Sequence, residues 1–424
     1  GLYVNTESIN KQFAKKHFDY DDGALFKCDA SGMFCDTTGT PPGGYPGLTW
    51  NGSSDSTLYY SSYDIKSNHG WKEFIDMIYA LNFTPNNLDS FLNIDRALWA
   101  FAVNTVIGNF DSYNGYYVHN YYMYQNEDNL FQMIPWDLSQ SFINALLGWD
   151  IFTPLGPTHP TQYDPYYGSD PSLFRPLTEF LFNNAEYRRQ YTAHLRTVIN
   201  EIDTNQIRSE VQTMQAMAYS AMDNDIHKLF SSADYFNNVE QDISNLSWGG
   251  YGFGGIMSCL RHRIPFLLAH SEISATPPNI FNVQVDNGII TANVNNESYV
   301  ELMATVSEYN SKFTSFDMYD DGTNGDAQAN DGIYSCYVPF ATSPLVKFYV
   351  KARNSQAMML SPERAEYEFF EYYSISNILD KPQSFNKQII FITDILGKKS
   401  KFKNNTPLIF IYDDGSAEKK FFVK

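Results

Sequence analysis

The residues best suited to chemistry in this sequence are two aspartates and an asparagine that lie between residues 109 and 142. Asp111 occurs in GNFDSYNGYY, Asn120 in VHNYYMY and Asp137 in IPWDLSQSF. A carboxylate and an amide oxygen form a pair of hard ligands that suits Mg²⁺, which takes its other ligands from water and phosphate. A further carboxylate could orient an attacking hydroxyl and accept its proton. Together these groups would suit phosphoryl transfer.

A β-hairpin is expected to bring these side chains together. Two short alternating runs, at 118–124 and 130–134, flank the turn-like segment QNEDN. Residues paired across an antiparallel ladder lie only about 4.5 to 5.5 Å apart, so Asn120 and Asp137 should emerge at the same open end of the hairpin. The loop that carries Asp111 enters at that end, which predicts convergence of all three side chains.

Spacing alone leaves a second interpretation open. Asp and Asn are ordinary turn formers, so Asp111 and Asp137 would then be loop caps, with Trp136 a simple core residue. His119, beside Asn120, could touch the site, and a plain hairpin side chain is the favoured alternative.

The surrounding pattern predicts an α+β protein of three domains. Helical spacing recurs at 71–81, 88–107, 177–202, 207–230 and 257–273. After about residue 275, short alternating runs are separated by turn residues roughly every ten positions, which is typical of a β-sandwich. We therefore expect a mostly helical domain with a β-hairpin at 1–274, an Ig-like β-sandwich at 275–373 and a small all-β domain at 374–424.

Composition excludes several classes of protein. The chain has 424 residues, more than the roughly 250 to 300 at which a single core stops growing. Its 29 Lys and Arg against 48 Asp and Glu give a net charge of -19, which argues against nucleic acid as a partner. No apolar run approaches the ~18 to 20 residues that span a bilayer, so no transmembrane segment is expected.

Several motifs resemble the CotH kinase family. GLYVNTESINKQFAKKHFDYDDGALFKCD is similar to that family's G-x-Y-x-x-x-E segment, which is followed by a helix and G-x-L-(Y/F)-K. GNFDSY, HNYYMY and IPWDLSQSF are similar to its GN-x-D, N-Y and PWD-x-D-x-(S/T)-F motifs. RPLTEFLFNNAEYRRQYTAHL and GGIMSCLRHRIPFLL match its later helices. The resemblance covers about residues 1–272, and the middle motif is its most specific part.

This resemblance implies a partial protein-kinase-like domain that uses ATP and Mg²⁺. By position, Asp111 corresponds to the catalytic base, Asp137 to a metal ligand and Asn120 to a second metal ligand. Glu7 corresponds to a residue on the nucleotide side. Protein kinases share this order of catalytic loop, hairpin and metal-binding Asp.

Two departures from the family pattern bear on activity. Ser139 stands where the family usually has a second Asp, and the upstream lobe that would supply a phosphate-binding Lys is expected to be missing from this sequence. Two hypotheses follow. The first is a secreted or surface kinase that transfers phosphate from ATP to protein hydroxyls. The second is a non-catalytic surface or adhesive protein that retains a kinase-like scaffold.

Two further features suggest structural sites. Cys28 and Cys35 could close a small disulfide loop if the protein is exported, and two unpaired thiols are the alternative. Within the sandwich, the run DMYDDGTNGDAQANDGIY could either wrap Ca²⁺ or form a plain solvated hairpin. Its candidate ligands are Asp317, Asp320, Asp321, Asp326 and Asp331.

The C-terminal segment 388–424 has a separate character. It is rich in Lys, and its runs IIFITDILGKKSKF and PLIFIYDDGSAEKKFFVK resemble the C-terminal sorting domain of type IX secretion cargo. The resemblance implies that the secretion machinery is a partner and that the protein reaches the cell surface or the medium. The alternative is a small β-domain that serves only as a spacer.

Overall fold

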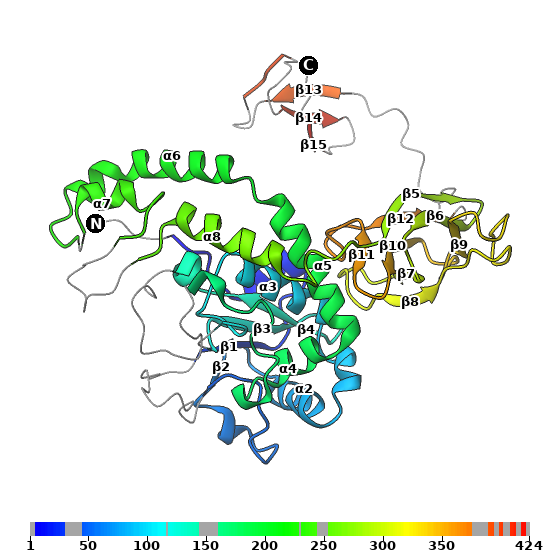
Figure 1. Ribbon diagram of the computed structural model, residues 1–424, viewed down its shortest axis with the longest axis horizontal. Helices are drawn as coiled ribbons and strands as arrows, with labels where there is room; N and C mark the ends of the chain where they lie inside the picture. Colours follow the sequence, from blue (N-terminus) through cyan, green and yellow to red (C-terminus); the bar gives the residue numbers. More distant parts are fainter. Residues whose placement is uncertain are drawn as a thin grey trace. The chain divides into compact units, whose positions relative to one another are not determined.

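The computed structural model describes residues 5–29, 45–115, 118–143, 160–228, 230–243, 253–374, 389–393, 398–401, 408–412 and 417–420. The fold is mixed α+β with several antiparallel sheets, as the sequence predicts (Figure 1). The chain forms two compact units. One comprises Gly1–Pro339 with Lys347–Glu371, and the other Phe340–Val346 with Tyr372–Lys424. The division into three domains at 274 and 373 stays a prediction.

A four-stranded antiparallel sheet lies at the centre of the N-terminal part of the larger unit. Its order is β2 (Tyr63–Ile65), β1 (Leu25–Cys28), β3 (Tyr121–Gln125) and β4 (Phe131–Pro135). Strands β3 and β4 are the predicted hairpin, and Met123 pairs with Met133 near its middle. The turn of the hairpin follows Gln125, at the opposite end of β3 from Asn120.

Each face of this sheet is covered by helices. Phe26, Met123 and Met133 lie on one face, in the main core with helices α2 (Trp71–Phe83) and α3 (Ile94–Val106). Because side chains alternate along a strand, their neighbours Leu25, Tyr122 and Ile134 point to the other face. There they pack with helix α1 (Lys11–Phe18), whose N-terminus is capped by Asn10.

Two of the predicted helical runs, 88–107 and 177–202, contain Asn residues that cap a helix inside the run. Asn93 accepts the N–H of Arg96, so α3 begins at Ile94 instead of Leu88. Asn184 accepts two N–H groups and separates two helices in the run 177–202. The helices are α4 (Pro176–Asn183), α5 (Ala185–Glu201), α6 (Thr204–Asp223), α7 (Ser232–Asn237) and α8 (Ile256–Ala269).

Two antiparallel sheets follow residue 275, as the alternating pattern predicts. One contains β5 (Asn279–Asp286), β6 (Ile289–Asn295) and β9 (Ile333–Tyr337). The other runs in the order β11, β10, β7 and β8, and β12 also pairs with β10. Their bounds are β7 Tyr299–Thr305, β8 Thr314–Asp317, β10 Leu345–Arg353, β11 Met358–Ser361 and β12 Phe370–Tyr373.

The sheets after residue 275 are joined to the helical part through buried polar contacts. The indole N–H of Trp99 in α3 donates to the Ala365 carbonyl at 2.8 Å. Asp95 of α3 accepts the Glu366 backbone N–H at 3.2 Å. These contacts hold strand-rich and helical segments in one compact unit.

The smaller unit contains a three-stranded antiparallel sheet of β13 (Ile389–Thr393), β14 (Leu408–Tyr412) and β15 (Ala417–Lys420). Leu408 and Phe410 are buried on one face, together with Ile392. The short strands expected in the C-terminal segment are therefore present. Among the helices of the described residues, none has the length and apolar character needed to cross a membrane.

Candidate functional site

The loop that carries Asp111 begins where helix α3 ends. Gly108 follows the helix with a φ of 64°, a left-handed conformation that suits glycine. Asn109 is buried, and its side chain donates to Asn104 Oδ1 of α3 at 3.2 Å. The N–H of Asp111 in turn donates to Asn109 Oδ1 at 3.1 Å. This chain of contacts fixes the backbone of Asp111 relative to α3.

Asn114 anchors the middle of the same loop. Its side-chain amide donates to the Phe101 carbonyl at 3.1 Å and to Thr105 Oγ1 at 3.0 Å. At the next position, Gly115 approaches Phe110 so closely that a Cβ would lie 2.2 Å from the Phe110 carbonyl oxygen. The loop is therefore a tightly packed structure that accepts little change of side chain or backbone.

The carboxylate of Asp111 contacts two residues at the start of the hairpin. His119 Nε2 lies 3.0 Å from Asp111 Oδ1. Asn120 Nδ2 donates to Asp111 Oδ2 at 3.0 Å and to the Asp111 carbonyl at 3.2 Å. The Asp111 side chain is 20% exposed, so it is restrained but still reaches solvent. The predicted meeting of Asp111 and Asn120 is present in the structure.

Asp137 lies one position beyond the ladder. The Trp136 N–H donates to the Asn120 carbonyl at 3.0 Å, so Trp136 is the residue that faces Asn120. Asn120 and Asp137 both have left-handed backbones, with φ of 57° and 45°. Asn and Asp adopt this conformation more readily than other non-glycine residues. Asp137 is exposed, and its Oδ1 accepts the Ser139 N–H at 3.2 Å.

The two candidate metal ligands fit the donor chemistry that Mg²⁺ requires. Because the amide nitrogen of Asn120 is directed to Asp111, its Oδ1 remains available, and no described residue donates to it. Oδ2 of Asp137 is likewise not engaged within the described ranges. Both are hard oxygen ligands. Asp111, His119 and Asp137 do not bring one ligand atom each within 4.8 Å of one another in the described structure, so the convergence of Asp137 with Asp111 stays a prediction.

Glu7 contacts helix α1. Its carboxylate lies 2.9 Å from Lys16 Nζ and 3.1 Å from His17 Nε2. The hydrogen bond from Lys16, followed by that from His17, lowers the pKa of Glu7. Its assignment to the nucleotide side stays a prediction.

Two groups of residues add to what the sequence indicated. His119, for which the sequence left open both a contact with the site and a plain hairpin role, contacts Asp111. The buried amides of Asn104, Asn109 and Asn114 were not recognised as the support of the loop. The sequence did contain a signal for these three amides, because a buried helix and loop rarely carry so many Asn residues without hydrogen-bond partners for them.

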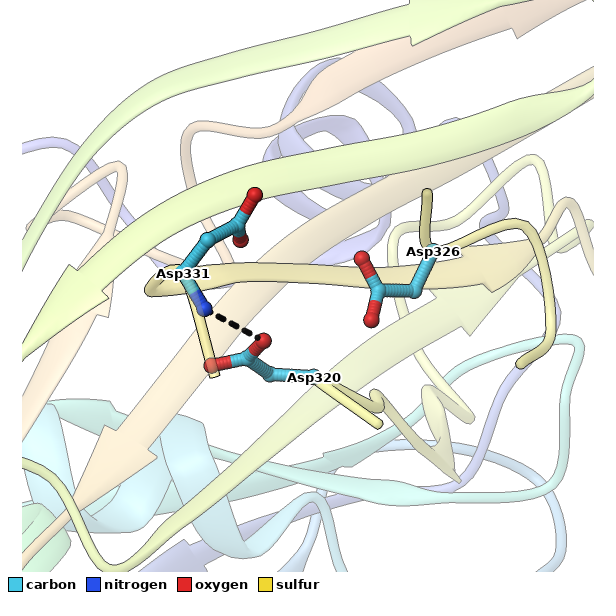
Figure 2. A group of neighbouring side chains, drawn as sticks. All are labelled: Asp320, Asp326 and Asp331. Carbon is cyan, nitrogen blue, oxygen red and sulfur yellow. Dashed lines mark hydrogen bonds between the residues drawn. The ribbon is translucent and has the colours of Figure 1, made fainter. Parts of the chain in front are cut away.

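The acidic loop between β8 and β9 brings three of its five candidate ligands together. Asp320, Asp326 and Asp331 have carboxylate oxygens within 4.8 Å of one another (Figure 2). Asp317 instead accepts the Tyr299 hydroxyl, and Asp321 accepts the Thr323 N–H at 2.9 Å. Calcium at this loop stays a prediction.

The three clustered carboxylates also bind backbone N–H groups. Asp320 accepts those of Asp331 at 3.1 Å and Gly332 at 3.0 Å. Asp326 accepts from Gln328 at 3.2 Å, and Asp331 accepts from Ile333 at 2.9 Å. The loop can therefore hold its conformation through its own backbone.

The predicted disulfide falls only partly within the described residues. Cys28 is a buried free thiol on strand β1, and burial raises the pKa of this thiol. Cys35 lies outside the described residues. The pairing of Cys28 with Cys35 stays a prediction.

The class of protein follows from comparison with known families. The family model described as CotH kinase protein matches residues 1–246. This chain therefore belongs to the CotH kinase family. No curated protein matches the chain.

Proposed function

We propose that this protein is a phosphotransferase that moves the terminal phosphate of ATP to a protein hydroxyl. The observation that carries this proposal is the double contact of Asn120 Nδ2 with Asp111, through the Asp111 carboxylate and carbonyl. One amide thereby positions the candidate base and directs its own oxygen elsewhere. These are the roles expected of a catalytic Asp, which accepts a proton, and of an Asn whose oxygen binds a metal ion.

Asp111 is suited to act as the base. A carboxylate has about four lone-pair positions, and His119 and Asn120 occupy only part of them. The remaining positions can accept the proton of a substrate hydroxyl. Because both oxygens are held by side chains of the hairpin start, the carboxylate keeps its direction during the approach of the substrate.

Asn120 and Asp137 would hold Mg²⁺. When bound, the ion would neutralise the charge of the phosphate groups. The chain's own contribution is to present two oxygens from a hairpin whose backbone is fixed at both positions. The left-handed backbones of Asn120 and Asp137 support this role, because such conformations concentrate at functional sites.

Ser139 supports a second candidate function, a non-catalytic scaffold. The family pattern places an acidic residue there, whereas Ser139 contributes its backbone N–H to Asp137 Oδ1. A hydroxyl supplies no negative charge to a metal ion. A protein with weakened metal binding would keep the fold and use its surface for adhesion.

Kinase assays on the protein and two variants test the choice. Asp111→Asn and Asp137→Asn should each lower phosphate transfer from ATP by about 100-fold or more. The first removes the positioned base, a kind of group that contributes about 10²–10⁴-fold, and the second removes a charged ligand of the ion that neutralises the phosphates. Asp76→Asn serves as the matched control, because Asp76 is partly exposed on α2 and pairs with Lys72. Transfer that persists in both site variants, or is absent from the unaltered protein with Mg²⁺, would refute the catalytic proposal.

We also propose that the protein is exported as type IX secretion cargo through residues 388–424, and that residues 275–373 form an Ig-like module. The separate compact unit at the C-terminus supports a sorting role, because a signal that machinery reads should fold apart from its cargo. Deletion of 388–424 should leave the protein inside the cell. Normal surface delivery of the shortened chain would refute the assignment.

A further inference from the structure

A polar pocket of about 360 Å³ lies where helix α5 begins, in the larger unit. Its wall is shared by α5, the segment after α8 and the loop between β10 and β11, which contribute Arg188, Arg189, Glu272, Ser355 and Gln356 among others. Pockets formed between separate parts of a fold are common places for small ligands, and this volume suits a molecule of monosaccharide size. None of the proposed catalytic residues lines it.

Arg188 forms a fixed part of the wall. Its guanidinium makes two hydrogen bonds of 2.7 Å to Glu272. It also lies 3.6 Å from the centre of the Tyr166 ring and donates to the Phe182 carbonyl at 3.0 Å. A guanidinium with these partners is neutralised and has few donors left for a ligand.

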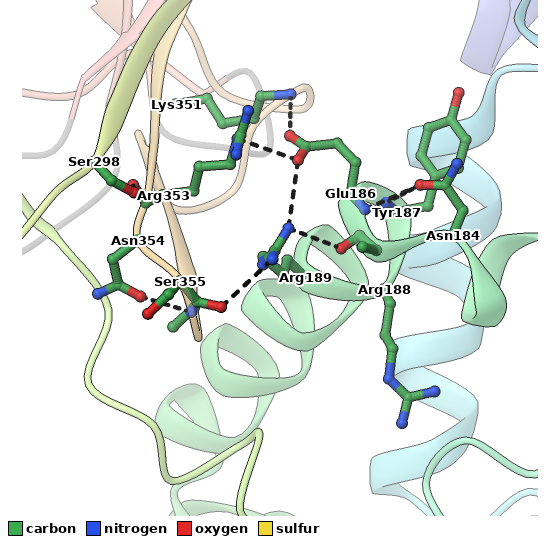
Figure 3. Close-up of polar contacts among 12 residues, drawn as sticks. Asn184, Glu186, Tyr187, Arg188, Arg189, Ser298, Lys351, Arg353, Asn354 and Ser355 are labelled. Carbon is green, nitrogen blue, oxygen red and sulfur yellow. Dashed lines mark hydrogen bonds and ion pairs between the residues drawn. The ribbon is translucent and has the colours of Figure 1, made fainter.

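Arg189 differs from its neighbour. Its guanidinium lies 3.4 Å from the carbonyl oxygens of Ala185 and Ser355, and 3.9 Å from Glu186 Oε2. All three distances are long for a charged donor, which prefers about 2.7 to 2.9 Å. The side chain is 25% exposed, so it can reach a molecule in the pocket. Figure 3 shows Arg189 pointing to Ser355, while Arg188 points away from it.

The nearest carboxylate does not neutralise Arg189. Glu186 lies 3.3 Å from both Lys351 Nζ and Arg353 Nε, so its charge is shared among cations (Figure 3). The cations of this cluster exceed the carboxylates by one. They are Arg188, Arg189, Lys351 and Arg353, against Glu186, Glu272 and Glu301. A positive surplus in a chain of net charge -19 favours a local anion.

We propose that this pocket binds a small polar molecule that carries a carboxylate or phosphate group, with Arg189 as the anion contact. The planar fork of a guanidinium matches both kinds of oxyanion. The amide side chain of Gln356 is available for the polar remainder of the ligand, because it makes no hydrogen bond to any residue that the structure describes. The volume exceeds what a lone inorganic anion fills, so the ligand has a polar body beyond its charged group.

Titration calorimetry on the full chain tests the proposal with three probes that share one sugar ring: glucuronate, glucose 6-phosphate and neutral glucose. At least one charged sugar should bind saturably, with a Kd of about 1 mM, and glucose should bind at least tenfold more weakly. Comparison of the two charged sugars identifies the oxyanion. Equal binding of glucose, or no binding of either charged sugar, would overturn the proposal.

Two variants locate the site. Arg189→Gln should weaken binding of the charged sugar at least tenfold, and so should Gln356→Glu, which adds a negative charge on an exposed loop and leaves α5 intact. Arg261→Gln is the matched control, since Arg261 lies on α8 and pairs with Glu240. Unfolding curves confirm that each variant is folded. Unchanged affinity in folded Arg189→Gln or Gln356→Glu protein would place the ligand elsewhere and refute the assignment.

Discussion

The Asp111 loop and the acidic loop at 320–331 both present carboxylates, but they hold them in opposite ways. Asp111 is held by side chains from another element, His119 and Asn120 at the start of the hairpin. Asp320 and Asp331 are held mainly by backbone N–H groups of their own loop. The two sets of contacts span similar distances along the sequence, 9 residues from Asn120 to Asp111 and 11 from Asp331 to Asp320, so the contrast lies in the donors, which are side chains in the first loop and backbone N–H groups in the second.

This difference separates a positioned reactive group from a turn-forming one. A carboxylate that accepts backbone N–H groups of its own loop already has a structural role, so its position can be explained without a bound ligand. A carboxylate that side chains of another element position has a direction that turn formation does not require. Function is therefore better inferred from what holds an acidic residue than from how many acidic residues are near.

The largest expected contrast lies in the supports of the two loops. Asn114→Ala removes four hydrogen bonds of a side chain that is only 3% exposed. It should lower the free energy of unfolding by about 2 to 4 kcal/mol, because buried partners are left unsatisfied. Asp321→Ala, which removes an exposed turn contact to Thr323, should cost less than about 1 kcal/mol. Urea unfolding measures both, and similar losses would contradict the contrast.

A smaller effect, on the rate of phosphate transfer, is expected from substitution of His119. His119→Ala should lower phosphate transfer by about 10- to 100-fold, since Asp111 loses one of its two side-chain contacts. His119→Gln retains an N–H donor of similar reach and should recover part of the rate. The kcat/KM values of the two variants and unfolding curves distinguish positioning from loss of structure. Equal rates in both variants would mean that the donor to Asp111 does not matter.

The sequence predicted those features that depend on local patterns. The alternation in YYMY and LFQMI predicted the hairpin, and the hairpin predicted that Asn120 would meet the Asp111 loop. The sequence placed Asn120 and Asp137 at the same open end of the hairpin, and the structure adds that Trp136, next to Asp137, is the residue that faces Asn120. Turn geometry sets the register, and the left-handed backbone at Asn120 has no unique sequence signal.

Features that depend on distant segments could not be predicted. The contact of Asp95 with His194 joins helices that are 99 residues apart, and its contact with the Glu366 backbone joins segments 271 residues apart. Asp95 and Glu366 belong to none of the motifs that the sequence analysis identified, and each would pass as a solvated surface charge. Asn93 and Asn184 were taken as helix interior because capping residues fit helical spacing when the apolar pattern continues beyond them.

Glu366 offers a third kind of carboxylate, one enclosed where the helical part meets the sheets. Burial raises its pKa well above the usual range, and the neighbouring charge of Asp95 raises it further. The Tyr349 hydroxyl donates to Glu366 Oε1 at 3.1 Å. The charged and titratable groups that face it are Asp95 and Arg96 of α3 and Tyr349 and Lys351 of β10, and His194 of α5 contacts Asp95.

The raised pKa determines the sign of a pH effect. The folded protein keeps a proton on Glu366 that the unfolded chain releases near pH 4.3, so the stability due to this group falls as the pH rises above that value. Glu366→Gln stays neutral and can still accept from Tyr349. It should be more stable than the unaltered protein by about 1 to 2 kcal/mol at pH 8 and nearly equal to it at pH 4. A difference that does not grow with pH would show that Glu366 is ionised without cost.

The smallest expected effect concerns calcium at the acidic loop. Asp320, Asp326 and Asp331 already accept hydrogen bonds from backbone N–H groups. A bound Ca²⁺ ion could therefore be coordinated only by the lone pairs of these carboxylates that remain. Saturating Ca²⁺ should therefore raise the free energy of unfolding by only about 1 kcal/mol, which corresponds to about 1 to 2 °C in Tm for a unit of this size, and a chelator should reverse the change. Asp326→Asn should abolish the shift, while Asp317→Asn, outside the cluster, should leave it intact. No shift with Ca²⁺, or an equal shift in both variants, would leave the loop as a solvated hairpin whose carboxylates serve only its own turns.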